Sequence, residues 1–250
     1  MILFLALGAA AQTTNGLSDA EIQGRKLAQQ LCDARPAENF TNVGILEIRN
    51  SKGERERNPI KCWITVTPTN WVNSYIVGRD AYIYSSLRYF WEVTNFSSIT
   101  TLGIVHGDMA SNRYEYDYMD NPNRVHSSND ANEPFAGSDF WICDLGLEFF
   151  HWPGQKILKK ENRRGRGCMV LESTNPEPST NGYSRVVSWI DEESGGIVQA
   201  EAYDFKNKLL KEFAPKSFKK VNGQWELQDM EIDNDQTGSR TRIEFDLKKQ

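Results

Sequence analysis

The three histidines are the first residues of this chain that could support metal or acid–base chemistry. His106, His126 and His151 are the only ones, and no two of them have the i, i+4 spacing of a helix-borne metal site. The sequence also lacks a G-x-S-x-G nucleophile elbow, a Walker loop and a G-x-G-x-x-G fingerprint. We therefore expect no metal ion and no cofactor, although histidines far apart in sequence could still meet in the folded chain.

Carboxylate pairs are frequent, and two acidic residues can act together as general acid and general base. Most of these pairs fall where the chain turns, and an Asp side chain at a turn usually bonds to nearby backbone. We therefore expect a protein without catalytic residues and keep an envelope hydrolase as the weakest alternative. The pairs are Asp117 with Asp120, Asp191 with Glu193, and Asp233 with Asp235.

Composition excludes further classes of protein. The formal net charge of −5 and the pI near 5.4 argue against nucleic-acid binding, which needs a clustered basic surface. One basic cluster does occur, and near a lipid cavity it could contact anionic headgroups or a membrane partner. The alternative is a solvated hairpin tip, because glycine in this stretch predicts a turn between two strands. The cluster comprises Lys159, Lys160, Arg163, Arg164 and Arg166.

The N-terminus resembles a secretory signal. Residues 1–11 form an apolar run that ends in Ala9-Ala10-Ala11, which fits the small-residue pattern of a signal peptidase site. We expect cleavage after Ala11, a single domain over residues 12–250, and export of the protein. Because a basic residue before the run is missing, a ragged apolar N-terminus is the alternative.

The four cysteines are widely spaced. Cys32, Cys62, Cys143 and Cys168 permit up to two disulfides in an exported chain, with three possible full connectivities. Free, buried cysteines are the alternative, and the spacing does not decide between them.

An amphipathic helix is expected over residues 18–32, ahead of the strands. Ser18 and Glu21 form a capping box, and apolar residues recur behind them at helical spacing. Such a helix should pack its apolar stripe against the sheet. A second, short helical element is expected from Ser138 through Leu145, with Ser138 as its cap.

Ten segments carry the composition and alternation that are typical of antiparallel strands. Asn207 fits a left-handed turn position, and Asn222-Gly223 is the strongest hairpin signal in the chain. Residues 120–134 are expected to form a long loop or flap. The expected strands are residues 40–49, 59–67, 71–77, 156–163, 166–172, 183–190, 197–203, 209–218, 225–232 and 240–247.

The strands carry more large apolar side chains than one buried sheet face requires. Seven tryptophans occur in the chain, largely on expected strands. Large groups on both faces suggest a sheet that curves around a cavity or around helices. Ordinary core packing is the alternative for each of them.

Several motifs between about residues 135 and 248 resemble the LolA-like outer-membrane lipoprotein-sorting proteins. These motifs specify strands and turns and contain no catalytic residue. Asn207 stands where the hairpin of that family often has Gly. The motifs are Gly137-Ser138-Asp139-Phe140 with Asp144-Leu145, the strand from Tyr183 to Asp191, Ala202-Tyr203-Asp204, Leu209-Leu210-Lys211, and Thr237-Gly238 with Thr241, together with Trp225 and Met230.

The resemblance implies a mainly β (α+β) fold, an incomplete antiparallel β-barrel curved around helices and similar to LolA and LolB. In that family an apolar cavity shelters acyl chains. We therefore expect a non-catalytic periplasmic carrier of lipid or lipidated protein. The alternative is a periplasmic sensor or adaptor that binds another envelope protein, because one fold can serve several functions.

Strand position and bulk select the side chains that would line the lipid site. Trp189 receives the most specific prediction, because alternation places it on one strand face with Val187 and Arg185. We expect that face to point toward the helices, with Arg185 at the rim; the alternative places Trp189 on the outer surface. The selected residues are Ile64, Val66, Trp71, Val187, Trp189, Phe213 and Trp225.

Overall fold

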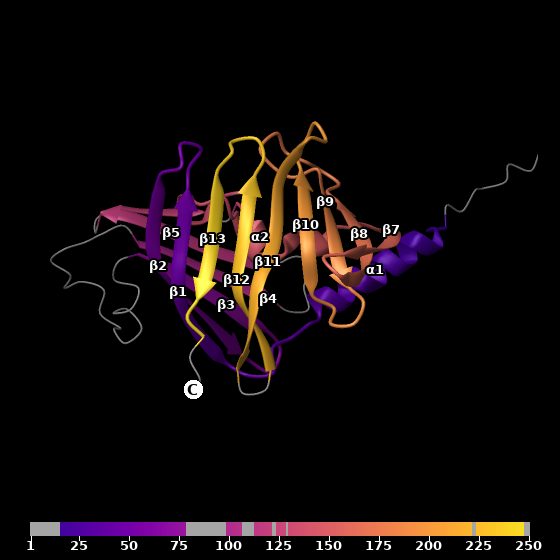
Figure 1. The fold of residues 1–250 in the computed structure, drawn as a ribbon, viewed down its shortest axis with the longest axis horizontal. Coiled ribbons are helices and arrows are strands. Elements are labelled where there is room, and N and C mark those ends of the chain that lie inside the picture. The colour runs from indigo at the N-terminus through magenta and orange to yellow at the C-terminus, as the bar shows by residue number, and fades with distance from the viewer. Residues whose placement is uncertain are drawn as a thin grey trace, which may run out of the picture.

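The computed structural model describes residues 16–78, 99–106, 113–121, 124–128, 130–221 and 224–247. The predicted signal segment and the Asn222-Gly223 turn lie outside these ranges. Within them, the chain forms one antiparallel sheet of 13 strands, an N-terminal helix and a short helical segment in mid-chain (Figure 1).

The strands form two meanders that meet in the middle of the sheet. The sheet order is β6-β5-β4-β3-β2-β1-β13-β12-β11-β10-β9-β8-β7, so the pairing of β1 with β13 joins the two halves. The first meander comprises β1 (Phe40–Arg49), β2 (Arg55–Val66), β3 (Trp71–Val77), β4 (Ile99–His106), β5 (Arg113–Asn121) and β6 (Arg124–Ser128). The second comprises β7 (Gly154–Arg163), β8 (Arg166–Thr174), β9 (Arg185–Asp191), β10 (Ile197–Tyr203), β11 (Leu209–Val221), β12 (Gln224–Asn234) and β13 (Arg240–Phe245).

The sheet curves but does not close, since β6 and β7 stand at its two ends. Figure 1 shows β3, β4 and β5 passing behind β11, β12 and β13, with α2 (Ile142–Gly146) between the two layers. The expected incomplete antiparallel barrel around helices is therefore confirmed. The expected loop over residues 120–134 is wrong in part, because β6 lies within it and pairs with β5.

Helix α1 (Asp19–Cys32) begins at the predicted capping box. The Ser18 backbone N–H donates to Glu21 Oε2 at 2.8 Å, and the Glu21 N–H donates to Ser18 Oγ at 3.4 Å. The helix lies against the edge strand β7, and a Cβ at Gly24 would lie 2.6 Å from the Lys156 backbone nitrogen. Glycine therefore permits α1 to approach this edge. Within the described ranges, no helix has the length and apolar character needed to cross a membrane.

The helical segment, residues 135–151, connects the two meanders. It consists of η1 (Phe135–Gly137), α2 and η2 (Glu148–His151). The prediction that Ser138 caps the helix is wrong, because α2 begins only at Ile142. The Trp141 backbone N–H donates to Asp144 Oδ2 at 2.8 Å, so Asp144 supplies the cap, while the Ser138 hydroxyl accepts from the Phe140 N–H.

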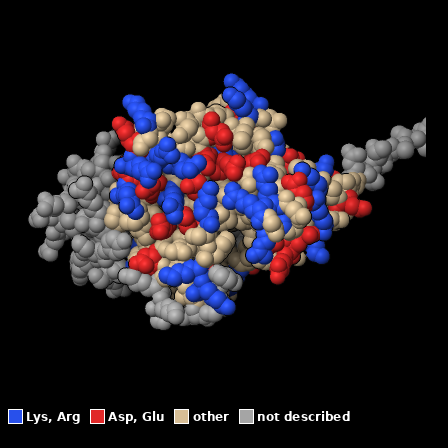
Figure 2. Space-filling model, viewed as in Figure 1, with Lys and Arg blue, Asp and Glu red and all other residues tan. Residues whose placement is uncertain are grey.

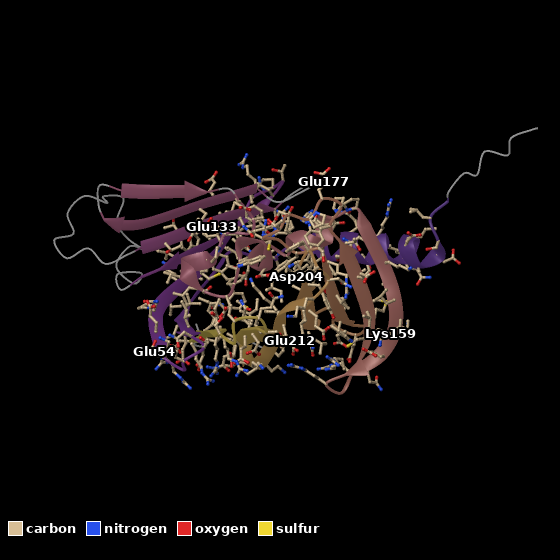
Figure 3. The ribbon with its side chains drawn as sticks, turned by 90° about the horizontal axis from the view of Figure 1, so that it is seen from above. Glu54, Glu133, Lys159, Glu177, Asp204 and Glu212 are labelled. Atoms are coloured by element: carbon tan, nitrogen blue, oxygen red, sulfur yellow. The ribbon has the colours of Figure 1, made fainter. Side chains whose placement is uncertain are left out.

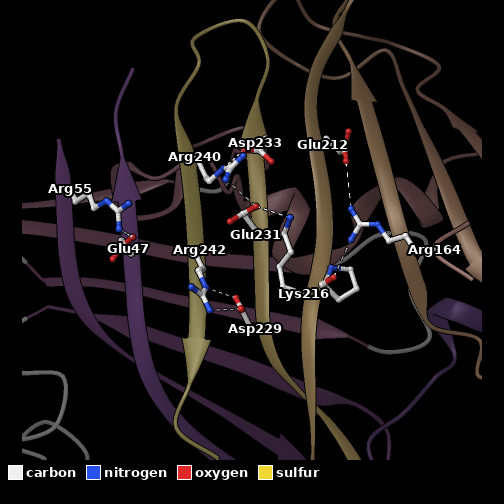
Figure 4. A network of polar contacts seen from close by, with 11 residues as sticks. Glu47, Arg55, Arg164, Glu212, Lys216, Asp229, Glu231, Asp233, Arg240 and Arg242 are labelled. Atoms are coloured by element: carbon white, nitrogen blue, oxygen red, sulfur yellow. Dashed lines mark hydrogen bonds and ion pairs between the residues drawn. The ribbon is translucent and has the colours of Figure 1, made fainter. Parts of the chain in front are cut away.

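The two faces of the sheet differ in chemistry. The concave face packs apolar side chains such as Leu46, Ile60, Leu102 and Ile243 together with the helical segment. The convex face carries interspersed acidic and basic side chains (Figure 2). Many of them form ion pairs across neighbouring strands, which Figure 4 shows for β1, β2 and β11 to β13. Exposed pairs of this kind contribute little stability each.

Candidate functional site

Aromatic side chains of the helical segment fill much of the space inside the curved sheet. Phe135 is fully buried and makes edge contacts with Tyr75 and Tyr116, at ring-centroid distances of 5.9 and 6.5 Å. Phe140 meets Phe213 of β11 in the same manner at 6.4 Å. The segment and the concave face therefore share one core, and a ligand inside the sheet must use space beside these rings.

A buried polar network around Asp144 fastens α2 to the sheet. The Tyr183 hydroxyl donates to Asp144 Oδ1 and Oδ2 at 2.9 and 3.0 Å, and Lys211 Nζ of β11 lies 3.5 Å from Oδ2. Lys211 is only 1% exposed, and its Nζ also lies 3.5 Å from the Trp141 ring centroid. Trp141 and Tyr183 stack at 4.6 Å. These contacts bind residues far apart in sequence into one unit.

Burial sets the titration of this network. Desolvation lowers the pKa of Lys211, while Asp144 opposes that shift. Desolvation, reinforced by the Asp144 charge, raises the pKa of Tyr183 well above its ordinary value. The sequence motifs contained all three residues, but nothing in the sequence indicated that they meet.

A second contact links the helical segment to β13. The backbone N–H of Asp139 donates to Thr241 Oγ1 at 2.9 Å, and the Thr241 hydroxyl donates to Asp139 Oδ2 at 2.9 Å. The Ser239 hydroxyl donates to Asp139 Oδ1 at 2.5 Å. The two motifs around Asp139 and Thr241 therefore hold the helical segment to β13 by hydrogen bonds, which is a structural role.

A small apolar cavity adjoins the Asp144 network. Its volume is about 30 Å³, and its walls include Phe149, Val186, Lys211, Phe213 and Ile232. A space of this size holds one or two water molecules. It is too small for an acyl chain in the structure as it stands.

A larger cleft lies at another part of the helical segment, and we call it the η1 cleft. It encloses about 420 Å³ between the concave side of the N-terminal strands and the residues around η1. Small-molecule sites of proteins commonly have volumes of about 300–1,000 Å³. Figure 3 shows Glu133 beside the N-terminal strands. The walls of the cleft include Glu56, Asn58, Val77, Thr100, Tyr116, Glu133, Pro134 and Ala136.

Four of the seven predicted lining residues lie on the concave side. Phe213 borders the small cavity. Cys62 of β2 belongs to the core of the concave face, and Ile64 and Val66 lie on the same side of that strand because side chains alternate. Trp71 of β3 pairs with Val66 and therefore lies on this side too. Trp71 stacks on His106 with centroids 5.1 Å apart. None of the four borders the η1 cleft, and the side chain of Trp225 lies outside the described residues.

The predicted orientation of Trp189 is wrong. Val186 and Ile190 pack inward with Phe149 and Phe150, whereas Val187 and Trp189 pack with Cys168 and Val170 on the opposite face. There, Trp189 Nε1 donates to Glu161 Oε1 at 2.5 Å, and the Arg163 guanidinium lies 4.6 Å from the ring centroid. Trp189 therefore belongs to the convex face, as does Arg185, which lies 3.5 Å over the Tyr203 ring.

All five residues of the basic cluster form ion pairs. Their hairpin turns at Arg164 and Gly165, both with positive φ, as the glycine in this stretch predicted. Each of these charges thus already has an acidic partner, and contact with anionic headgroups stays a prediction. The pairs are Lys159 with Glu161, Lys160 with Glu192, Arg163 with Glu201, Arg164 with Glu212, and Arg166 with Asp191 and Glu193.

The cysteines and histidines form no joint site in the described part of the chain. The four cysteines are free thiols, and burial raises the pKa of Cys32 to about 11 and that of Cys62 to about 12. Burial also lowers the pKa of His151. No group of three or more His, Cys, Asp or Glu residues among those described could hold a metal ion. The side chain of His126 lies outside them.

The fold is that of LolA-like proteins. A DUF1329 family protein from Desulfovibrio piger superimposes with a TM-score of 0.69 at 18% identity, covering 91% of this chain and 92% of that one. A proposed outer membrane lipoprotein-sorting protein domain from Vibrio parahaemolyticus gives 0.67 at 21% identity, covering 91% and 92%. A LolA superfamily protein from Nitrosomonas europaea gives 0.57 at 13% identity, covering 90% and 91%.

The chain belongs to a family whose model, described as "Uncharacterized protein", matches residues 99–249. The match spans more than half of the chain and includes the helical segment and all of the second meander. No curated protein matches.

Proposed function

We propose that this protein is a non-catalytic periplasmic carrier that binds the acyl part of a lipid or lipidated protein inside its curved sheet. The observation that carries the proposal is the η1 cleft of about 420 Å³ between the concave face and the helical segment. The LolA-like fold and the lipoprotein-sorting description of one structural neighbour support it. The predicted signal over residues 1–11 supports the location.

The cleft adjoins the apolar core of the concave face, against which an acyl chain could pack. Val77 and Tyr116 on its walls also belong to the apolar cluster that continues along the concave face through Leu102 and Ile104. Each CH₂ group hidden from water contributes about 0.8 kcal/mol. A chain of about 16 carbons would gain on the order of 10 kcal/mol before the costs of association. Release then requires a competing apolar site at a membrane.

A matched pair of variants on β2 tests the site. Asn58 borders the cleft, and Asn58→Trp places a large ring in the space where the ligand would lie. Arg57 precedes it, points to the opposite face and pairs with Glu47, so Arg57→Trp is the control. Titration with an uncharged fluorescent acyl probe should show affinity at least about ten-fold weaker for Asn58→Trp, since a buried Trp fills a large volume. Arg57→Trp should bind as the wild type does.

Native mass spectrometry of protein from a mild envelope preparation tests the carrier role directly. A carrier should retain a lipid mass that Asn58→Trp loses. A sensor or adaptor should retain none and bind no probe. Equal probe affinity of Asn58→Trp and the wild type, with both folded by circular dichroism, would contradict the assigned site.

A further inference from the structure

The walls of the η1 cleft carry hydrogen-bond acceptors and no positive charge among the described residues. Two carboxylates, Glu56 from β2 and Glu133 ahead of η1, face this space together with the Asn58 amide. The Asn58 side-chain N–H donates to Glu56 Oε1 at 2.9 Å. Neither glutamate forms an ion pair with any Lys or Arg side chain in the described ranges, unlike the carboxylates of the convex face.

The side chain of one threonine also borders the cleft. Thr100 is only 3% exposed, borders the cleft, and stands opposite Val77 in the pairing of β3 with β4. A hydroxyl that faces the cleft can donate to or accept from a ligand atom.

The charge pattern selects the kind of polar group that can enter. Carboxylates in a cleft with low-dielectric walls concentrate negative potential, which attracts cations and repels anions. An anionic carboxylate or phosphate bound there would meet no described counter-charge, and burying an unpaired charge is unfavourable. An ammonium group carries up to three donors and could bond to both glutamates and the Thr100 hydroxyl.

We propose that the η1 cleft binds the ammonium group of an amphiphile, so that the acyl ligand is an amine-bearing lipid and not a fatty acid. This inference rests on the proposed acyl binding and names its ligand class. It also assigns headgroup recognition to Glu56 and Glu133, in place of the basic hairpin whose charges are already paired.

Displacement of the uncharged acyl probe by ligands of equal chain length tests the inference. Dodecylammonium should displace the probe at concentrations on the order of ten-fold lower than dodecanoate, with dodecanol between them, because the two carboxylates attract the ammonium and repel the carboxylate. In Glu56→Gln/Glu133→Gln, the three ligands should become nearly equal while the dodecanol value stays unchanged. Glu177→Gln, which removes one exposed carboxylate outside the cleft, should leave the wild-type order intact.

The source of the ammonium group is distinguished by two lysophospholipids. If the ligand is a lipid headgroup, lysophosphatidylethanolamine should displace the probe at lower concentrations than lysophosphatidylglycerol. If the two lysophospholipids are equal and only dodecylammonium is preferred over dodecanoate, the ligand is a free amine amphiphile. If the probe binds but dodecanoate displaces it at the same concentration as dodecylammonium or at a lower one, the inference is overturned and the proposed function still stands. Absence of probe binding would overturn both.

Discussion

Replacement of Asp144 by Asn should remove much of the stability that the helical segment provides. Asn keeps the volume of Asp and an oxygen that can accept from the Trp141 N–H and the Tyr183 hydroxyl. It removes the negative charge 3.5 Å from Lys211 Nζ. Lys211 is 1% exposed, so its ammonium would remain inside the protein without a counter-charge.

The expected loss follows from the geometry. At 3.5 Å, two unit charges in an effective dielectric of about 20 attract by about 5 kcal/mol. Removal of one partner of a buried pair costs about 3–5 kcal/mol in measured cases. We therefore expect Asp144→Asn to lower the free energy of unfolding by about 3–5 kcal/mol. With a urea dependence of about 3 kcal/mol per molar, the midpoint should fall by roughly 1–2 M.

Urea unfolding followed by tryptophan fluorescence measures this shift. Lys211→Met removes the ammonium instead, and Asp144 then retains its bonds to Tyr183 and Trp141. That variant should lose less stability, and the double variant should be more stable than Asp144→Asn alone. Glu212→Gln breaks the ion pair with Arg164, in which both side chains are more than one-third exposed. This change should lower the free energy of unfolding by less than about 1 kcal/mol. A loss for Asp144→Asn no larger than that of Glu212→Gln would refute the reasoning.

Three further outcomes follow. Gly24→Ala should destabilise the protein by about 1–3 kcal/mol in urea, because its Cβ would lie 2.6 Å from the Lys156 nitrogen and overpacking outweighs better helix propensity; unchanged stability would contradict the close approach of α1. Trp189→Ala should lower stability by about 3 kcal/mol or more yet leave acyl-probe affinity unchanged, since the ring packs on the convex face; weaker binding by the folded variant would contradict this. Cys62 has its pKa raised from 9.0 to about 12, so the folded state retains the thiol proton longer than the unfolded state. The unfolding free energy should therefore fall between pH 9 and 12, and less steeply in Cys62→Ala; equal slopes would contradict the burial of this thiol.

The sequence alone determined the elements whose signals are local. The capping box of Ser18 and Glu21 fixes the start of α1, because its hydrogen bonds join residues three positions apart. Asn207 adopts a positive φ of 60° at its turn, as its side chain permits. The strand patterns and the motifs of the second meander were enough to predict an open antiparallel barrel. Three strands of the first meander, β4, β5 and β6, were not among the expected ones, and β6 lies in a polar stretch with Pro and Asn.

Only the tertiary structure decided which face of each strand is inside and where a ligand fits. Every residue from Val186 to Asp191 is buried, so alternation divides β9 into two faces without distinguishing the concave one. That choice depends on the helical segment, which meets Val186 and Ile190, and on Arg163 and Glu161, which cover Trp189 from the other side. The η1 cleft likewise combines residues from β2, β3, β4, β5 and the approach to η1, and the Asp144 network joins positions 39 and 67 residues apart. Such contacts arise from chain folding over long separations, and local periodicity carries no information about them.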